Sequence, residues 1–326
     1  MTSILLVKTS SLGDVVHNLP VVSDIHARFP RARVDWVVEE SFAELPRLHP
    51  GVSTIIPVAI RRWRRQLLHR ATWREIGAFR RALGANQYDY VVDTQGLLKS
   101  ACITWQAHGL RCGYSAEAAR EPLAARFYDR GYAIPRNLHA VERNRWLAAA
   151  ALEYPPDLPL RYGIAAPARP DAEPYCVLLT ATSRADKNWP DVQWLALGQL
   201  LNLRGYACVL PAGSKVERAR AERLAQNMRR AQCAPPSNLT QLAGLLAGAA
   251  AVVGVDTGLT HLAAALGRPT VAVFGATDPM LTGVHAGAQA VNLGRMGQLP
   301  DAQEVAATLF ELVASTAGAA AGATPT

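Results

Sequence analysis

The sequence lacks the features that mark membrane-spanning, disulfide-rich or zinc-binding chains. No apolar run reaches the roughly 18 residues that a membrane-spanning helix needs. The five cysteines are odd in number and scattered, and none forms a Cys-x-x-Cys pair, which argues against a zinc ribbon or a redox motif. The start of the chain is too short an apolar segment, and wrongly flanked, for a signal peptide. We therefore expect a cytoplasmic chain whose thiols are buried and reduced.

Charged residues are also scarce, and they are unevenly distributed. Only 18% of the 326 residues are charged and half are hydrophobic, which is typical of a folded globular protein with room for two domains. The net charge of +8 favours anionic partners such as nucleic acid, anionic lipid or phosphorylated small molecules. Residues 61–81 contain eight arginines against one acid, Glu75. Some of these arginines suit a solvated helix face, but the dense cluster around Trp63 matches the geometry of phosphates.

Apolar segments alternate between strand-like and helical patterns along most of the chain. This alternation predicts an α/β protein with parallel sheets covered on both faces. The expected strands are residues 4–8, 33–38, 55–58, 88–93, 175–179, 206–210, 251–255 and 270–274. The expected helices are residues 15–29, 73–83, 190–204, 217–230, 239–247 and 302–312, with a further helix opening at Gln95.

Proline-rich sequence at about residues 155–174 separates two α/β halves of similar size. We expect an N-terminal domain at residues 1–160, a second domain at 170–313, and a disordered tail of low complexity at 314–326. The carboxyl ends of the parallel strands in two such halves are expected to face into a cleft.

The loop after the first strand, residues 8–14, is the first candidate for a functional site. It contains neither the Gly-x-Gly-x-x-Gly dinucleotide pattern nor the phosphate loop that ends in Gly-Lys-Ser/Thr. A typical dehydrogenase and a nucleoside triphosphatase are therefore disfavoured. The loop does place a carboxylate, Asp14, at the carboxyl end of a strand. Asp14 is either a helix cap or a general base that takes a proton from an attacking hydroxyl.

Two loops of the second half suit a phosphate. Residues 180–190 place hydroxyls and Lys187 between a strand and a helix, although a polar loop that caps the next helix has the same composition. Residues 251–266 predict a buried strand, a tight turn at 256–258, and a helix whose first N–H groups attract an anion. An ordinary strand-turn-helix connection has this pattern too. His261 has no partners at metal-ligand spacing, so we predict no metal site.

Several of these loops belong to longer motifs. The motifs lie at residues 8–17 (Lys-Thr-Ser-Ser-Leu-Gly-Asp-Val-Val-His), 35–40, 56–64, 93–100, 119–124, 139–143, 186–190 and 256–261 (Asp-Thr-Gly-Leu-Thr-His). Together they closely resemble the lipopolysaccharide heptosyltransferases of glycosyltransferase family nine, and the resemblance covers roughly residues 4–285.

The resemblance implies a GT-B architecture of two Rossmann-like domains. It implies transfer of L-glycero-D-manno-heptose from ADP-heptose to the Kdo sugar of Kdo-lipid A, with inversion. No cofactor or metal ion is implied, and the expected location is the cytoplasmic face of the inner membrane, as a peripheral protein. The arginine cluster at residues 61–65 is a candidate for binding the acceptor's phosphates or an anionic membrane surface.

The resemblance also assigns roles to single residues, with Asp14 as the catalytic base. Donor contacts are implied for Thr182, Ser183, Lys187, Glu217, Asp256, Thr257, Gly258 and His261. Ser237 belongs to the same set, although the family commonly has a methionine near the adenine at this place. The acceptor is expected to contact Lys8, Arg61, Arg62, Arg64 and Arg120.

Three other functions compete with this interpretation. The nearest is a heptosyltransferase that acts at the next position of the same core, although residues 58–64 favour transfer to Kdo. A GT-B sugar-nucleotide epimerase is more distant, and it would consume the donor without any acceptor. The basic charge also suits a nucleic-acid-binding module. The arginines are not interleaved with the exposed aromatics that a stacking platform needs, so we expect no nucleic acid partner.

Overall fold

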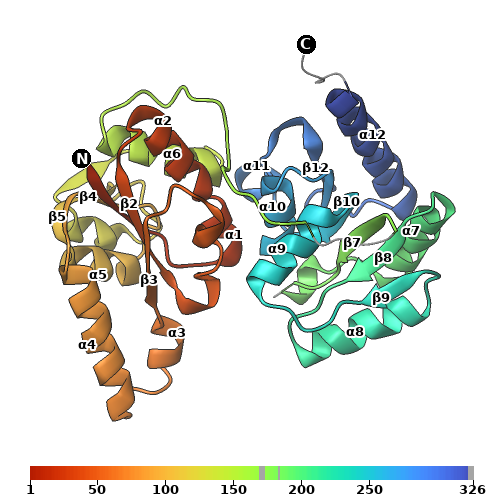
Figure 1. Ribbon diagram of the computed structural model, residues 1–326, viewed down its shortest axis with the longest axis horizontal. Coiled ribbons are helices and arrows are strands. Elements are labelled where there is room, and N and C mark those ends of the chain that lie inside the picture. Colours follow the sequence, from red (N-terminus) through yellow and green to blue (C-terminus); the bar gives the residue numbers. More distant parts are fainter. Residues whose placement is uncertain (169–172, 183, 322–326) are drawn as a thin grey trace. The chain divides into compact units, whose positions relative to one another are not determined.

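The computed structural model of the chain describes residues 1–168, 173–182 and 184–321. The chain divides into two compact units, which we call unit 1 (Met1–Ile164) and unit 2 (Ala165–Thr326). Each unit contains a six-stranded sheet flanked by helices (Figure 1). Counted within its unit, each sheet has the strand order 3-2-1-4-5-6 of the Rossmann fold, and neighbouring strands are parallel. The expected fold class is therefore confirmed.

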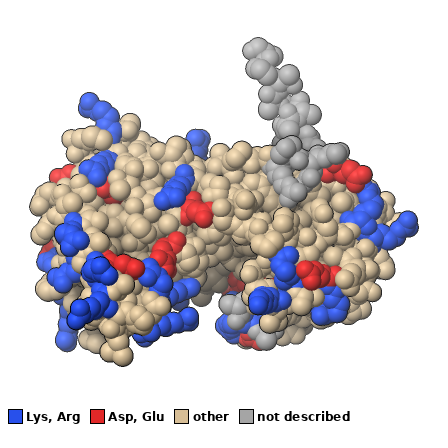
Figure 2. Space-filling model, turned by 60° about the horizontal axis from the view of Figure 1, so that its bottom comes forward, with Lys and Arg blue, Asp and Glu red and all other residues tan. Residues whose placement is uncertain are grey.

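Unit 1 is built around strand β1 (Ser3–Val7), in the sheet order β3-β2-β1-β4-β5-β6. Its other strands are β2 (Arg33–Glu39), β3 (Thr54–Val58), β4 (Gln87–Asp93), β5 (His108–Tyr114) and β6 (Arg130–Tyr132). Its helices are α1 (Leu12–Val16), α2 (Leu19–Arg28), α3 (Ile60–Trp63), α4 (Arg70–Gly84), α5 (Leu98–Gln106) and α6 (Ala140–Ala151). Lys and Arg side chains gather on the end of unit 1 that carries α3 and α4 (Figure 2).

Strand β1 lies at the centre of its sheet because both of its faces are apolar. Residues 4–7 are fully buried, as expected for a parallel strand covered on both sides. Leu5 packs in one cluster with Phe79 of α4 and Ile103 of α5, so these two helices cover one face. Alternate side chains of β1 point to the opposite face. Helices α2 and α6 contact each other, and α6 also contacts β4.

Unit 2 repeats this plan around strand β7 (Tyr175–Leu179), in the sheet order β12-β11-β10-β7-β8-β9. Its other strands are β8 (Ala207–Leu210), β9 (Ala231–Cys233), β10 (Ala251–Val255), β11 (Thr270–Val273) and β12 (Ala290–Leu293). Its helices are α7 (Asp191–Leu203), α8 (Lys215–Gln226), α9 (Leu239–Gly248), α10 (Gly258–Ala265), α11 (Pro279–Thr282) and α12 (Ala302–Ala321).

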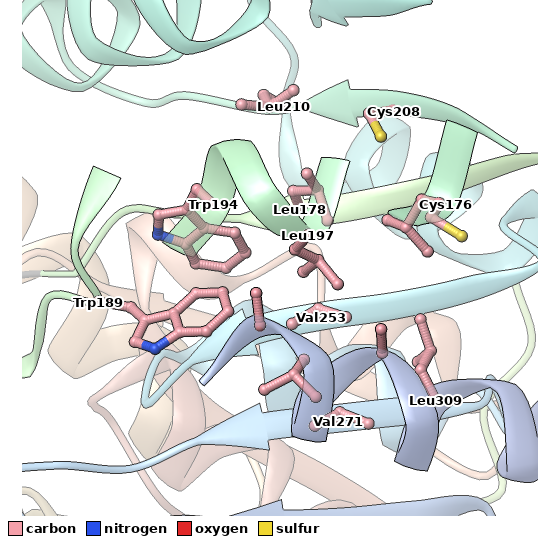
Figure 3. Packing of buried hydrophobic residues seen from close by; sticks show 14 of the residues in the cluster. Cys176, Leu178, Trp189, Trp194, Leu197, Cys208, Leu210, Val253, Val271 and Leu309 are labelled. Atoms are coloured by element: carbon pink, nitrogen blue, oxygen red, sulfur yellow. The ribbon is translucent and has the colours of Figure 1, made fainter. Parts of the chain in front are cut away.

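The main core of unit 2 lies where α7, α8 and α12 meet the sheet (Figure 3). Trp189 and Trp194 meet edge to face, with ring centroids 4.8 Å apart. Leu197 of α7 and Leu309 of α12 pack in the same cluster with Val253 of β10. Strand β10, which precedes the candidate phosphate-binding turn at residues 256–258, thus packs in the same cluster as the two tryptophans of the unit.

One expected helix, residues 15–29, is two helices in the structure. Helix α1 ends at Val16, and α2 begins at Leu19 after the N-cap residue Asn18. Pro20 lies in the first turn of α2, where its missing N–H costs nothing, but the same residue cannot continue an earlier helix. The loop and short helix that hold Asp14 are therefore separate from the longer helix behind them.

The ends of the sheets and of the chain also differ from expectation. The sequence did not predict β5, β6, β9 and β12, of which β6, β9 and β12 are edge strands. Residues 314–321 were expected to be disordered, but α12 continues through Ala321. Alanine has the highest helix propensity, so this alanine-rich segment extends the helix. Residues 322–326 of the expected tail lie outside the described residues.

The packing of α7 predicts a difference between two leucines on one helix. Leu197→Ala is expected to lower the free energy of unfolding by about 2–5 kcal/mol, because Leu197 is fully buried and its loss leaves a cavity. Leu203→Ala is the matched control, since Leu203 is 83% exposed and its loss is expected to cost less than about 0.5 kcal/mol. Urea unfolding followed by circular dichroism measures both. Equal midpoints for the two variants would contradict this packing.

Candidate active site

Candidate residues cluster at the carboxyl edge of each sheet, beside the same two strands of the fold. In the order 3-2-1-4-5-6 the chain changes direction between the first and fourth strands, and α/β sheets bind ligands at this switch point. In unit 1 the switch-point strands are β1 and β4, which are followed by Lys8 and Thr94. In unit 2 they are β7 and β10, which are followed by Thr180 and Asp256.

Asp14 lies in the first turn of α1 and is held by the residue that caps this helix. Its Oδ2 accepts hydrogen bonds from the Ser11 amide at 2.7 Å and the Ser11 hydroxyl at 2.9 Å. Its Oδ1 lies 4.0 Å from Nη1 of Arg120. The Asp14 side chain is 26% exposed, so a substrate hydroxyl can reach it. Asp14 is thus a helix-capping residue whose carboxylate stays accessible, so the capping contact is compatible with the role of general base, which stays a prediction.

The charges around Asp14 keep its carboxyl ionised. Burial alone would raise the pKa of Asp14, but the Lys8 ammonium and the hydrogen bonds from Ser11 outweigh it. The guanidinium of Arg120 adds to the same effect, and the pKa of Asp14 lies below its ordinary value. The carboxyl is therefore a carboxylate at neutral pH, which is the state that a general base requires.

Lys8 was expected to contact the acceptor, but the structure buries its side chain. Nζ of Lys8 donates to the Thr94 carbonyl at 2.8 Å and to Oδ1 of Asn144 at 3.3 Å. Burial lowers the pKa of Lys8 to about 8, although the charges of Asp14 and Asp93 oppose this shift. The buried ammonium therefore stabilises the Asp14 carboxylate from the interior of unit 1 and does not face solvent. The sequence alone could not show this, because the burial of Lys8 depends on β4 and α6.

Gln95 and Lys99, which the sequence analysis did not select as site residues, join the loops after β1 and β4. Oε1 of Gln95 accepts from the amide and the hydroxyl of Thr9, at 2.7 Å and 2.8 Å. Nε2 of Gln95 donates to the Ser10 carbonyl at 2.7 Å, and Nζ of Lys99 donates to the Ser10 hydroxyl at 2.7 Å. Both residues lie in the family-like motif 93–100, directly after the fourth strand. That position was the signal that could have identified them.

Arg62 was also expected to contact the acceptor, but two carboxylates occupy its guanidinium. Nη2 of Arg62 lies 2.9 Å from Glu40, and Nη1 lies 2.8 Å from Glu75. All three residues line a hollow of about 490 Å³ between β3 and α4. Arg62 therefore joins α3 to α4 and to the loop after β2. Its neighbours Arg61 and Arg64 are the better placed candidates for the acceptor.

Three arginines of the expected acceptor set, Arg61, Arg64 and Arg120, are exposed. The Arg61 guanidinium lies 5.3 Å from the ring centre of Phe42, within the range of a cation–π contact. Lys99 interacts electrostatically with both Arg61 and Asp14. Burial and the charge of Arg61 lower the pKa of Lys99, while nearby carboxylates, including Asp14, oppose this shift. Positive charges thus extend from Arg61 to Asp14, an arrangement that suits an acidic sugar or a phosphate.

Asp256 is the centre of the candidate site in unit 2. Its Oδ2 accepts from Nζ of Lys187 at 2.5 Å and from the Thr277 hydroxyl at 2.8 Å. Its Oδ1 lies 3.8 Å from Nε2 of His261, and its backbone carbonyl accepts from the Thr182 hydroxyl at 3.4 Å. Burial alone would raise the pKa of Asp256, but hydrogen bonds from His261 and Lys187 hold it far below its ordinary value. The structure thus brings four of the expected donor residues together.

Helix α10 begins directly after this cluster, at Gly258. Thr257 is its N-cap residue, and within the described part of the chain the Thr257 side chain makes no capping hydrogen bond. The Thr260 amide of the first turn donates to the Thr257 carbonyl at 3.0 Å, whereas the amides of Gly258 and Leu259 have no acceptor among the described residues. These two amides are the candidates for binding an anion, and the helix dipole favours negative charge at this end. Lys187, held through Asp256, adds a cationic side chain near the same turn.

The remaining donor candidates are more dispersed. Oε2 of Glu217 accepts from the amides of Gly213 and Ser214, both at 2.9 Å, and so caps α8. Ser237 lines a hollow of about 580 Å³ in unit 2, and its hydroxyl donates to the Pro235 carbonyl at 2.9 Å. Ser183 lies outside the described residues.

The described ranges 1–168, 173–182 and 184–321 contain neither a metal-binding cluster nor a membrane-spanning helix. No group of three or more His, Cys, Asp and Glu side chains in these ranges is placed to hold a metal ion. None of the helices in this part of the chain is long and apolar enough to cross a bilayer.

The cysteines were expected to be buried, and this expectation is wrong in part. Cys102 is exposed and Cys233 is only partly buried, whereas Cys112, Cys176 and Cys208 are buried.

Comparison with known proteins shows close relatives. Residues 76–309 match the family described as Glycosyltransferase family 9 (heptosyltransferase). Lipopolysaccharide heptosyltransferase 1 of Pseudomonas aeruginosa is 47% identical over 299 residues, which are 89% of this chain and 83% of that protein. E. coli heptosyltransferase WaaC solved with ADP has a TM-score of 0.91 and 43% identity, covering 95% of this chain and 100% of that chain. WaaC with ADP-2-deoxy-2-fluoro heptose has a TM-score of 0.86 and 42% identity, covering 97% and 100%.

The two Rossmann-like units and their sites define a glycosyltransferase of the GT-B fold. The chain belongs to glycosyltransferase family 9, the heptosyltransferases. Lipopolysaccharide heptosyltransferase 2 of Salmonella typhimurium is less similar, at 28% identity over 305 residues, or 86% of this chain and 84% of that protein. The resemblance that the motifs indicated is confirmed.

The contact between Lys8 and its surroundings predicts a change in the titration of Asp14. Lys8→Met keeps the apolar stem but removes the charge that does most to stabilise the Asp14 carboxylate, so the pKa of Asp14 is expected to rise. Carbon-13 NMR of the Asp14 carboxyl during a pH titration measures the shift. Lys215→Met, at an exposed lysine of unit 2, is the control and is expected to leave the titration unchanged. An unaltered Asp14 titration in Lys8→Met would refute this coupling.

Proposed function

We propose that this protein transfers L-glycero-D-manno-heptose from ADP-heptose to the Kdo sugar of Kdo-lipid A, with inversion at the anomeric carbon. The observation that carries the proposal is the chemistry at the two switch points. Unit 1 has an ionised, partly exposed carboxylate, and unit 2 has a lysine beside a helix start. The ligands named for the two WaaC structures support the choice of donor. The higher identity to a heptosyltransferase 1 than to a heptosyltransferase 2 supports the choice of acceptor.

Unit 2 is proposed to bind the donor. Lys187 and the first N–H groups of α10 would stabilise the negative charge that develops on the leaving diphosphate. Preorganised positive charge of this kind can serve in place of a metal ion, so we propose a metal-independent reaction. The residues proposed to line the donor pocket are Thr182, Ser183, Lys187, Asp256, Thr257, Gly258 and His261. Glu217 and Ser237 are proposed to lie on the ribose and adenine side.

Asp14 is proposed to act as the general base. The acceptor hydroxyl gives its proton to the Asp14 carboxylate while its oxygen attacks the anomeric carbon of the heptose. The bond between that carbon and the diphosphate oxygen breaks, and ADP leaves with the electron pair. Attack from the face opposite the leaving group makes this a single displacement, which inverts the configuration.

Unit 1 is proposed to bind the acceptor. The exposed arginines Arg61, Arg64 and Arg120 suit the Kdo carboxylate and the phosphates of lipid A. Arg120 lies 4.0 Å from the base, and Lys99 is coupled electrostatically to both Arg61 and the base. In this proposal residues 1–160 form the acceptor domain and residues 170–313 the donor domain. Because the acceptor is a lipid, the protein is proposed to work as a peripheral protein on the cytoplasmic face of the inner membrane.

Asp14→Ala tests the proposed base. The rate of transfer is expected to fall by about 10²–10⁴-fold, because the acceptor hydroxyl loses its proton acceptor. Binding of ADP is expected to be unchanged, since the proposed diphosphate contacts lie in unit 2. A coupled assay of ADP release from ADP-heptose and Kdo-lipid A measures the rate, and calorimetry measures ADP binding.

The control for this variant is Asp157→Ala, which removes a carboxylate of unit 1 that is 63% exposed and is expected to keep normal turnover. Near-normal turnover in Asp14→Ala would refute the assignment. The assay also separates the alternatives. Transfer only to an acceptor that already carries heptose would indicate the next core position, and donor consumption without acceptor would indicate an epimerase.

Lys187→Met tests the donor site. ADP is expected to bind about 10- to 100-fold more weakly, because a hydrogen bond assisted by charge is lost. Lys187→Arg is expected to recover part of the affinity, since it keeps the charge but not the shape. Isothermal titration calorimetry with ADP measures the dissociation constants, and Lys215→Met is the control for removal of an exposed lysine. An unchanged dissociation constant in Lys187→Met would exclude this lysine from the diphosphate site.

A further inference from the structure

The connection from α3 to α4 carries an unusual group of exposed apolar side chains. We call residues 64–74 the tip; they comprise this connection and the first turns of α4. Helix α4 extends past the sheet of unit 1, and the tip lies at its outer end (Figure 1). Leu67 is 50% exposed, Leu68 is 98% exposed and Trp73 is 60% exposed. A single exposed leucine is common on protein surfaces, but three large apolar side chains within seven residues form a patch.

The backbone of the tip presents these side chains in a defined way. The His69 amide donates to the Gln66 carbonyl at 3.0 Å, so Leu67 and Leu68 occupy the two central positions of a turn. Glycine, proline, asparagine and aspartate are preferred there, and two leucines give the turn no conformational advantage. Nε1 of Trp73 donates to the Leu67 carbonyl at 2.8 Å. This bond satisfies the polar atom of the indole and leaves its ring at the surface.

The polar residues around this patch are cationic. The tip contains four exposed arginines, Arg64, Arg65, Arg70 and Arg74, and no acid. The nearest acid, Glu75, is engaged by Arg62 and by Nε1 of Trp63. Figure 2 shows Lys and Arg side chains gathered on this end of unit 1. The tip therefore combines a small apolar apex with a surrounding excess of positive charge.

We infer that the tip inserts Leu67, Leu68 and Trp73 into a lipid bilayer whose anionic headgroups are bound by the surrounding arginines. A bilayer matches both features of the tip. Its acyl chains can accommodate a few large apolar side chains, and its negative headgroups can bind the arginines around them. Tryptophan and arginine suit the boundary between the two layers, because each has an apolar body and a polar end.

The tip is continuous with the candidate acceptor site of unit 1. Arg61 lies three residues before it, and the Arg61 amide donates to Oε1 of Glu39 at 3.0 Å, at the carboxyl end of β2. Lys99, which is coupled electrostatically to Arg61, also senses Asp14. A bilayer bound at the tip would thus lie on the side of unit 1 that carries the base. This step rests on the proposed function, because only a lipid-linked acceptor benefits from it.

Binding to vesicles tests the inference without donor or acceptor. The full-length protein is expected to co-sediment with vesicles of phosphatidylglycerol and phosphatidylcholine, and to bind weakly to phosphatidylcholine alone. Leu68→Ser is expected to weaken binding by about tenfold or more, because the most exposed apolar side chain of the tip is lost. Leu203→Ser, at a leucine of unit 2 that is 83% exposed, is the matched control and is expected to bind normally. Raised salt and the double variant Arg70→Gln, Arg74→Gln are expected to weaken binding as well.

Depth-dependent quenching by brominated lipids locates the inserted side chains. Tryptophan fluorescence is expected to be quenched in vesicles, and Trp73→Phe is expected to remove most of the quenching. Trp105→Phe is the matched control, since Trp105 of α5 is also 60% exposed but lies outside the tip. Quenching that persists in Trp73→Phe and disappears in Trp105→Phe would overturn the inference.

Two further outcomes would also overturn it. One is equal vesicle binding by Leu68→Ser and Leu203→Ser. The other is self-association in solution that Leu68→Ser abolishes, which would make the tip a contact between copies of the chain. Transfer to a water-soluble, deacylated acceptor is measured in parallel and is expected to be unchanged in Leu68→Ser. Loss of vesicle binding with intact transfer concerns the tip alone, whereas absence of transfer in the wild-type protein concerns the proposed function.

Discussion

The buried ammonium of Lys8 is the charge on which the edge of unit 1 depends. Asp14 and Asp93 both lie within its field, and burial alone would raise the pKa of each carboxyl. The position of the ammonium is fixed by the Thr94 carbonyl, so it depends on the pairing of β1 with β4. The strand order of the sheet therefore determines the charge state of a carboxylate at its surface. If the same loop followed a strand that does not pair with β4, its carboxyl would lack this buried ammonium and would have a higher pKa.

The parts of the site that could be predicted are local in sequence. An apolar run that stops at Asp256 predicts a strand and a helix start, because burial and turn chemistry leave their pattern in neighbouring residues. Charge pairing is not local: Lys187 lies 69 residues from Asp256, and Arg62 lies 22 residues from Glu40. No periodicity shows such partners. Edge strands such as β6, with three residues, are likewise too short to produce a pattern.

The two units share a strand order but differ in the electrostatics of their switch points. In unit 1 a carboxylate is partly exposed and cations stabilise it from within and from the side. In unit 2 the carboxylate of Asp256 is mostly buried and serves to hold Lys187 and Thr277 beside a helix start. The same fold thus presents a partly exposed carboxylate in one unit and a lysine beside a helix start in the other. Fold and motif together identify the class, while the chemistry of each edge follows from a few charged side chains.

The anchoring of Asp14 by Ser11 also bears on regiochemistry. Both the amide and the hydroxyl of Ser11 bind Oδ2, so the carboxylate has little freedom to turn. Its rotational entropy is lost when the chain folds and not when a substrate arrives. Oδ1 then points in a fixed direction, so the proposed base would accept a proton only from a hydroxyl that occupies one place. Under the proposed function, the start of α1 would therefore help to select which hydroxyl of a polyhydroxylated acceptor is extended.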